Sequence, residues 1–184
     1  MKDWRFWIVF AVLAVVQVIL CNFLDLSRYA VLSFLPVLIL MLPLRLDTVP
    51  LMLISFALGF AVDFFSTGML GLTAASLVPV GLMRNSVVAS LFGDELGPRD
   101  GELTVTWFGV PKFALATLIL CSIYFFIYVL IDAAGTYGFL AGALRFALST
   151  ALSTPVCLGV AVILRPESYE ELGRAVVAFH VTRA

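Results

Sequence analysis

Long apolar stretches separated by short polar groups fill this chain up to about residue 164. A helix needs about twenty mainly apolar residues to cross the ~30 Å hydrocarbon core of a bilayer. Residues 103–109 alternate between apolar and polar, which predicts a short strand or hairpin lying against the membrane. The pattern predicts one membrane domain with six spanning helices, over residues 6–24, 29–44, 49–65, 69–83, 113–131 and 138–164.

Composition agrees with a membrane protein. Hydrophobic residues make up 62% of the 184 residues and charged residues only 12%, whereas soluble domains average about 25% charged residues. The expected fold class is therefore an all-α integral membrane protein. A net charge of −1 leaves no basic surface that could neutralise phosphates, which excludes nucleic-acid binding driven by counterion release.

The third and fourth predicted spans form a short hairpin around a polar turn. Each arm holds roughly fifteen apolar residues, which reach about 22 Å at 1.5 Å per residue and fall short of the hydrocarbon core. Ser66, Thr67 and Gly68 supply the turn, and Asp63 comes before all three. We expect Asp63 at or just beneath the membrane interface, where a charged side chain is retained for a partner or a water-filled recess.

Two charged residues inside the apolar runs have alternative interpretations. Asp63 can cap the turn, pair with a cation, or join Ser66 and Thr67 in a cation site or proton path. Arg145 can extend its side chain to the nearby interface, or pair with Asp63 or Asp132. We hypothesise that Asp63 pairs with a cation, because it precedes the turn and is expected to be partly submerged beside other elements.

Three glycines and one arginine complete the candidate structural or partner-binding residues of the hairpin. Gly59, Gly68 and Gly71 predict close approach of helices or flexible points in the turn, in preference to a ligand cradle. Arg84 is expected to close the fourth span at the membrane surface. Pro36, in the second span, predicts a kink in that helix.

The sequence shows no catalytic machinery. The only histidine, His180, lies in the terminal segment, and no nucleophile has a recognisable base beside it. Cys21, Cys121 and Cys157 each stand alone in an apolar run and are interpreted as small core residues. Their spacing indicates neither a disulfide framework nor a metal site. We therefore expect no enzyme, no cofactor and no metal.

Basic residues predict the orientation in the membrane, because cytoplasmic segments carry an excess of Lys and Arg. With the N-terminus inside, only Arg28 falls in an outside connection, so both termini are expected in the cytoplasm. Residues 165–184 combine a capping-box spacing with apolar residues at helical intervals, which predicts a cytoplasmic amphipathic surface helix. Nine basic residues fall in the inside segments: Lys2, Arg5, Arg45, Arg84, Arg99, Lys112, Arg165, Arg174 and Arg183.

The hairpin also carries a motif. Residues 58–63 read LGFAVD, Gly68 and LGL at 70–72 follow, and MRN at 83–85 closes the fourth span. In order and spacing these residues resemble the MreD family, the rod shape-determining membrane proteins of bacteria. The length of the chain, the six predicted spans and the two cytoplasmic termini are also similar to that family.

The resemblance implies a non-catalytic component of the cell-wall elongation machinery in the bacterial cytoplasmic (inner) membrane, which helps to maintain cell shape. It also implies partners, namely an MreC-like bitopic protein and, through it or directly, MreB and RodA with its penicillin-binding transpeptidase. No small-molecule substrate is expected.

An alternative comes from another class of protein. The six-helix architecture is also similar to the substrate-binding components of energy-coupling-factor vitamin transporters. Such a component would need an outward-facing pocket with several polar contacts, and the outside connections of this chain hold few polar residues.

Overall fold

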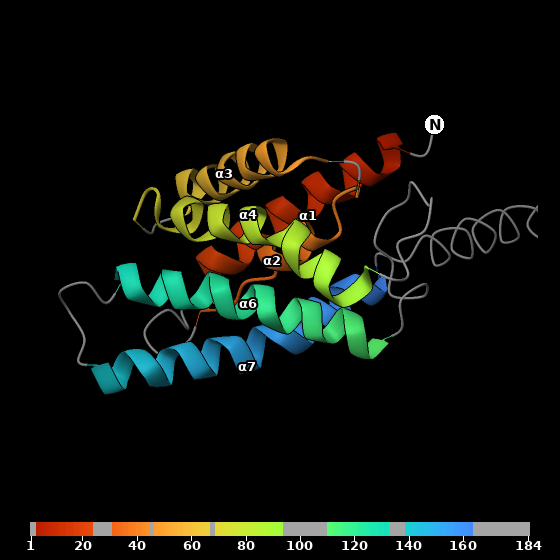
Figure 1. The fold of residues 1–184 in the computed structure, drawn as a ribbon. Helices are drawn as coiled ribbons and strands as arrows, with labels where there is room; N and C mark the ends of the chain where they lie inside the picture. Colours follow the sequence, from red (N-terminus) through yellow and green to blue (C-terminus); the bar gives the residue numbers. More distant parts are fainter. Residues whose placement is uncertain are drawn as a thin grey trace, which may run out of the picture.

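The computed structural model describes residues 3–23, 31–44, 46–66, 69–93, 110–132 and 139–163. These residues form a bundle of helices, and the part of the chain they cover contains no strand (Figure 1). The helices are α1 (Asp3–Phe23), α2 (Leu35–Leu40), α3 (Thr48–Phe65), α4 (Leu72–Phe92), α6 (Val110–Asp132) and α7 (Phe139–Ile163).

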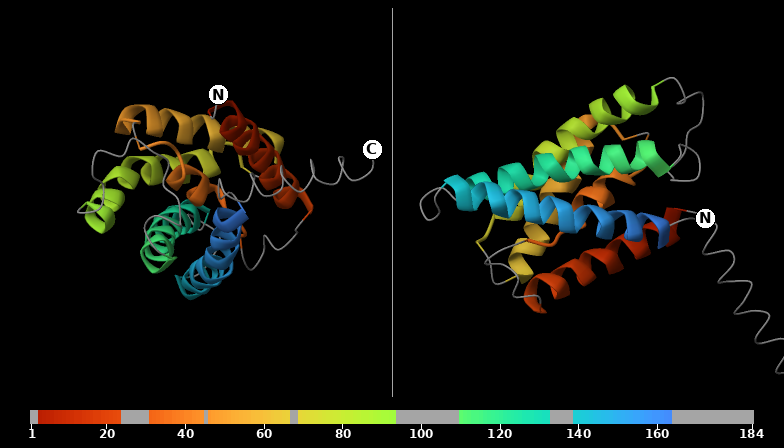
Figure 2. Two further views of the ribbon diagram at one scale, coloured as in Figure 1. Left: turned by 90° about the vertical axis from the view of Figure 1, so that its right-hand side faces the viewer. Right: turned by 90° about the horizontal axis from the view of Figure 1, so that it is seen from below.

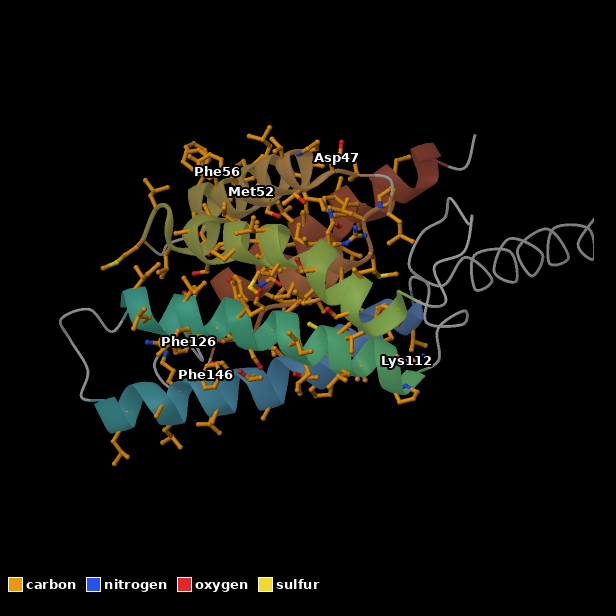
Figure 3. All side chains as sticks on the ribbon, in the orientation of Figure 1. Asp47, Met52, Phe56, Lys112, Phe126 and Phe146 are labelled. Atoms are coloured by element: carbon orange, nitrogen blue, oxygen red, sulfur yellow. The ribbon has the colours of Figure 1, made fainter. Side chains whose placement is uncertain are left out.

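Four of the described helices, α3, α4, α6 and α7, are long and apolar enough to cross a membrane. Their outer faces carry large apolar side chains, as membrane lipid requires. Phe56, which projects from the outer face of α3 in Figure 3, is 51% exposed, and Leu140 of α7 is 83% exposed. Between α6 and α7, the rings of Phe126 and Phe146 meet edge to face, with centroids 6.3 Å apart (Figure 3). The structure thus agrees with an all-α membrane protein.

The prediction of a continuous second span over residues 29–44 is wrong. Of the described residues 31–44, only Leu35–Leu40 is helical, and six residues extend about 9 Å, too little to cross a bilayer. Two prolines explain the interruption. A helical proline removes one backbone hydrogen bond and its ring collides with the carbonyl four residues earlier. Pro36 lies in the first turn of α2 and disfavours helix before it, and Pro43 disfavours any continuation of the helix beyond its observed end at Leu40.

The interrupted segment nevertheless returns across the bundle. The C-terminal end of α1 and the N-terminal end of α3 lie at opposite ends in Figure 1, so residues 31–46 connect the two ends. Every residue of α2 is buried, and α2 contacts α4, α6 and α7. Irregular backbone at membrane depth is tolerated only where protein encloses it. We call residues 31–46 the interrupted crossing.

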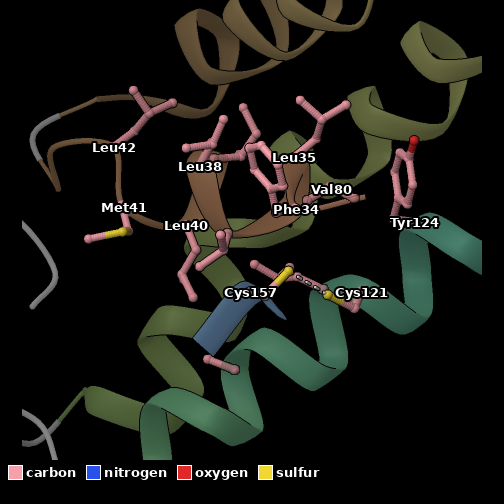
Figure 4. Close-up of a cluster of buried hydrophobic side chains, with 14 of the residues drawn as sticks. Phe34, Leu35, Leu38, Leu40, Met41, Leu42, Val80, Cys121, Tyr124 and Cys157 are labelled. Carbon is pink, nitrogen blue, oxygen red and sulfur yellow. Dashed lines mark hydrogen bonds between the residues drawn. The ribbon is translucent and has the colours of Figure 1, made fainter. Parts of the chain in front are cut away.

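The apolar core gathers around the interrupted crossing. Figure 4 shows Phe34, Leu35 and Leu38 between the α3–α4 hairpin and the helices α6 and α7. These side chains are at most 2% exposed. The element with the least regular backbone is therefore also the most completely buried part of the described chain.

The hairpin is longer than predicted. α3 has 18 residues and α4 has 21, about 27 and 31 Å, so both arms match the hydrocarbon core. The sequence also allows residues 87–92 to extend the fourth helix, and α4 does continue to Phe92. The expected place of Arg84 at the membrane surface is wrong. Arg84 does not end the helix because its side chain turns inward and is fully buried.

The two outer ends of the helical bundle are close in space. The first residues of α1 and the last residues of α7 lie at the same end of the molecule in both Figure 1 and Figure 2. The expected surface helix over residues 165–184 and the short strand over residues 103–109 lie outside the described residues.

Candidate functional site

Asp63 lies near the C-terminal end of α3 and is buried, with 4% exposure. Its carboxylate accepts three backbone N–H groups from the beginning of α4. Oδ2 accepts those of Gly71, at 3.0 Å, and Ala74, at 3.1 Å, and Oδ1 accepts that of Thr73, at 3.2 Å. Asp63 is therefore the N-terminal cap of α4, supplied from the neighbouring helix.

The cap is needed because the first N–H groups of a helix have no partner within the helix. The residue at the N-cap of α4 is Gly71, which has no side chain and a backbone φ of +92°. A carboxylate also suits the positive end of the helix dipole. Among the described residues, these amides take the place of the cation that we hypothesised as the partner of Asp63.

Two glycines bring α3 and α4 into close contact. A Cβ on Gly59 would lie 2.5 Å from Ala74 Cα, and a Cβ on Gly81 would lie 3.0 Å from the Leu51 carbonyl oxygen. Gly59 thus has the close approach expected for it. Gly81 was not singled out from the sequence, and Gly68 lies outside the described residues.

Arg84 holds the far end of the interrupted crossing. The side chain is 0% exposed and reaches from α4 to the carbonyl oxygens of Leu40, at 3.1 Å, and Leu42. Its other terminal nitrogen donates to Asn85 Oδ1 at 3.0 Å. The last carbonyls of a helix carry partial negative charge and lack partners within the helix. Arg84 therefore caps the C-terminal end of α2.

Asn85 extends this contact toward α3. Its Nδ2 donates to the Leu46 carbonyl at 3.3 Å and contacts Thr48 Oγ1 at 3.4 Å. Adjacent residues of α4 thus bind the chain where it leaves α2 and where it enters α3.

Gln17 of α1 binds the near end of the interrupted crossing. Its side-chain amide donates to the Leu32 carbonyl at 3.2 Å and accepts the Phe34 N–H at 3.1 Å. Gln17 is 1% exposed. Both backbone groups lie before the start of α2 and therefore have no partner within a helix. The Gln17 side chain supplies a hydrogen bond to each.

α7 binds the same extended stretch from the other side. The hydroxyl of Ser149 accepts the Val31 N–H at 2.8 Å, and that of Ser153 accepts the Ser33 N–H at 3.2 Å. Cys157 donates to the Ser33 carbonyl at 3.6 Å. The three α7 residues follow one another at intervals of four, so they share one face of the helix.

Gln17→Leu is expected to destabilise the protein, because it leaves two buried backbone groups without partners at about 1–3 kcal/mol each. The thermal midpoint in detergent should fall by about 4 °C or more. Ser122→Ala is the matched control, since that hydroxyl bonds only the Leu118 carbonyl of its own helix among the described residues. Equal midpoints for the two variants would contradict the role of Gln17.

Arg145 pairs with Asp132, one of the two partners considered for it. The pair joins the last residue of α6 to the first half of α7, and the side chains are 11% and 21% exposed. Asp132 stands at the negative end of the α6 dipole, where a carboxylate is unfavourable. The guanidinium compensates that charge.

Cys121 of α6 and Cys157 of α7 are fully buried with sulfur atoms 3.7 Å apart (Figure 4). Both are free thiols. They pack as small core side chains, and sequence spacing gave no sign that they would meet.

Asp63, Arg84, Gln17, Ser149 and Ser153 all form hydrogen bonds with backbone groups. No three His, Cys, Asp or Glu side chains of the described residues converge in a way that could hold a metal ion. The chemistry that this arrangement supports is structural, since buried backbone groups and helix ends receive the partners that lipid cannot give.

Comparisons with known proteins found no match in any of three searches, against protein-family models, curated proteins and solved structures.

Proposed function

We propose that this chain is a non-catalytic membrane component of a bacterial cell-wall elongation complex, of the kind the MreD family provides. One observation carries the proposal. The residues through which the hairpin resembles that family include Gly59, Asp63, Gly71, Arg84 and Asn85, and each has a defined structural contact in the hairpin or at the interrupted crossing. These contacts support a structural role for the motif, as the proposal requires.

The proposed partners follow from the same resemblance. They are an MreC-like bitopic protein, and through it or directly MreB and RodA with its penicillin-binding transpeptidase, at the cytoplasmic membrane. The apolar outer faces of the helices are compatible with lipid and with the single membrane helix of a bitopic protein alike.

Purification of the tagged full chain in mild detergent tests the proposal. We expect an MreC-like protein to co-purify, and an unrelated tagged membrane protein with several spans serves as the control. Co-purified ATPases together with a bound vitamin would instead identify the substrate-binding component of a vitamin transporter and contradict the proposal.

The proposed orientation places both termini in the cytoplasm. Arg84 is buried, so eight of the nine inside basic residues remain to support it. In a chain whose own cysteines are replaced by alanine, a cysteine at position 99 or 174 should resist membrane-impermeant thiol reagents in intact cells. A cysteine at position 27 or 136 should react. Labelling at position 99 before lysis would contradict this orientation and indicate the opposite one.

A further inference from the structure

Three oxygen atoms converge on the buried guanidinium of Arg84. They are the carbonyl oxygens of Leu40 and Leu42, at the end of α2, and Oδ1 of Asn85 on α4. Within the described part of the chain none of the groups that bind this guanidinium is a carboxylate. A full positive charge is thus held by neutral oxygens and the end of a helix.

We propose that these oxygens form a cation site for planar nitrogen donors of the guanidinium class, which the chain fills with its own arginine. In membrane proteins, unwound carbonyls and the C-terminal ends of broken helices coordinate monovalent cations. α2 is a broken helix of this kind, and its terminal carbonyls face Arg84 in the position that a bound ion would take. The inference concerns this site alone and is independent of the proposed cellular role.

The pattern of hydrogen bonds specifies the ligand. Both terminal nitrogens of Arg84 donate to the oxygens, whereas Nε has no hydrogen-bond partner among the described residues. A free guanidinium ion consists only of such terminal groups, so it can make every bond that Arg84 makes. A spherical ion donates no hydrogen bond, and an alkylammonium offers one donor nitrogen where Arg84 offers two in a fixed plane.

The site makes Arg84 a tether between two elements that are far apart in sequence. The arginine belongs to α4, and the carbonyls belong to the interrupted crossing, 44 and 42 residues earlier. Loss of the cation leaves two buried carbonyls without donors and frees the end of α2.

The first test compares Arg84→Lys with Arg84→Met in the full chain. Both replacements are long and flexible, but only lysine keeps a cation. We expect the lysine variant to have a thermal midpoint higher by about 4 °C, because a carbonyl site stabilises a charge. If Arg84 only fills space, a buried lysine costs more than methionine. A midpoint for Arg84→Met equal to or above that of Arg84→Lys would overturn the proposal.

The second test adds methylguanidinium chloride to Arg84→Ala at millimolar concentration. At about five times its dissociation constant the ion should raise the midpoint by about 2–4 °C. Wild type, whose site holds its own guanidinium, should not respond, sodium should not replace the ion, and methylammonium, which offers one nitrogen, should raise the midpoint of Arg84→Ala by less. No rise for Arg84→Ala, or an equal rise with sodium chloride, would overturn the assignment.

Discussion

Asp63→Leu is expected to remove most of the stability of the protein. The change leaves the N–H groups of Gly71, Thr73 and Ala74 without an acceptor in a buried site. Each such group costs about 1–3 kcal/mol, and a whole domain is stable by only about 5–15 kcal/mol. The measurement is the monodisperse fraction and thermal midpoint of the purified protein in mild detergent. We expect aggregation, or a midpoint lower by at least about 10 °C.

Asp63→Asn distinguishes between two roles of Asp63, a cap on three backbone amides and a simple turn residue. Both carboxylate oxygens of Asp63 accept amides, whereas asparagine offers one acceptor and places a donor against the remaining N–H groups. The thermal midpoint of Asp63→Asn should lie between those of wild type and Asp63→Leu. The matched control is Asp47→Asn at the N-cap of α3, where the exposed side chain makes no capping bond. Wild-type stability of Asp63→Asn would contradict the three-amide cap.

Gly59→Leu is expected to separate α3 from α4. Even the first carbon of a side chain would lie 2.5 Å from Ala74 Cα and 2.8 Å from Ala74 N, both backbone atoms that cannot move independently of their helix. The displacement would also draw the Ala74 amide away from Asp63, so the variant loses packing and cap together. We expect loss of folded protein for leucine and a midpoint at least about 5 °C lower for alanine.

Gly159 of α7 provides the control for this prediction. A Cβ there meets nothing within 4 Å, and alanine favours a helix over glycine. Gly159→Ala should therefore match or exceed wild type in midpoint. If Gly59→Ala and Gly159→Ala proved equally stable, the close packing of α3 on α4 would not be needed for the fold.

Hydropathy predicted the long helices well, because lipid forces a spanning segment to be both apolar and helical. It failed at residues 29–44, which are as apolar as their neighbours. This segment differs from its neighbours in holding Pro36 and Pro43. From the sequence alone, Pro36 was interpreted as a kink in a continuous helix, and not as the cause of an interrupted one. The end of the fourth span failed for a related reason. Arg84 was taken as a surface charge because sequence does not show which way a side chain points.

The candidate site was predicted in part. Asp63 and Gly59 were singled out correctly as unusual, since a carboxylate ahead of its turn and a glycine in an apolar helix both require a reason. For Asp63 the structure shows the cap that the sequence analysis named as an alternative, and not the cation pair that it preferred. The particular backbone groups were not predictable, because amides and carbonyls carry no signature in the residue type. Gln17, Ser149 and Ser153 escaped attention for the same reason. The one available signal was the interval of four between Ser149, Ser153 and Cys157, which places them on one helix face.

Cell width after depletion of the chain from the cells that express it is the most direct measurement of the proposed role. If the chain is a component of the wall elongation complex, rod-shaped cells should widen and become round as the protein is lost. Expression of the wild-type chain should restore the rod, and expression of Asp63→Leu should not. Cells that keep their width while uptake of a vitamin falls would contradict the role in wall elongation and identify a transporter component instead.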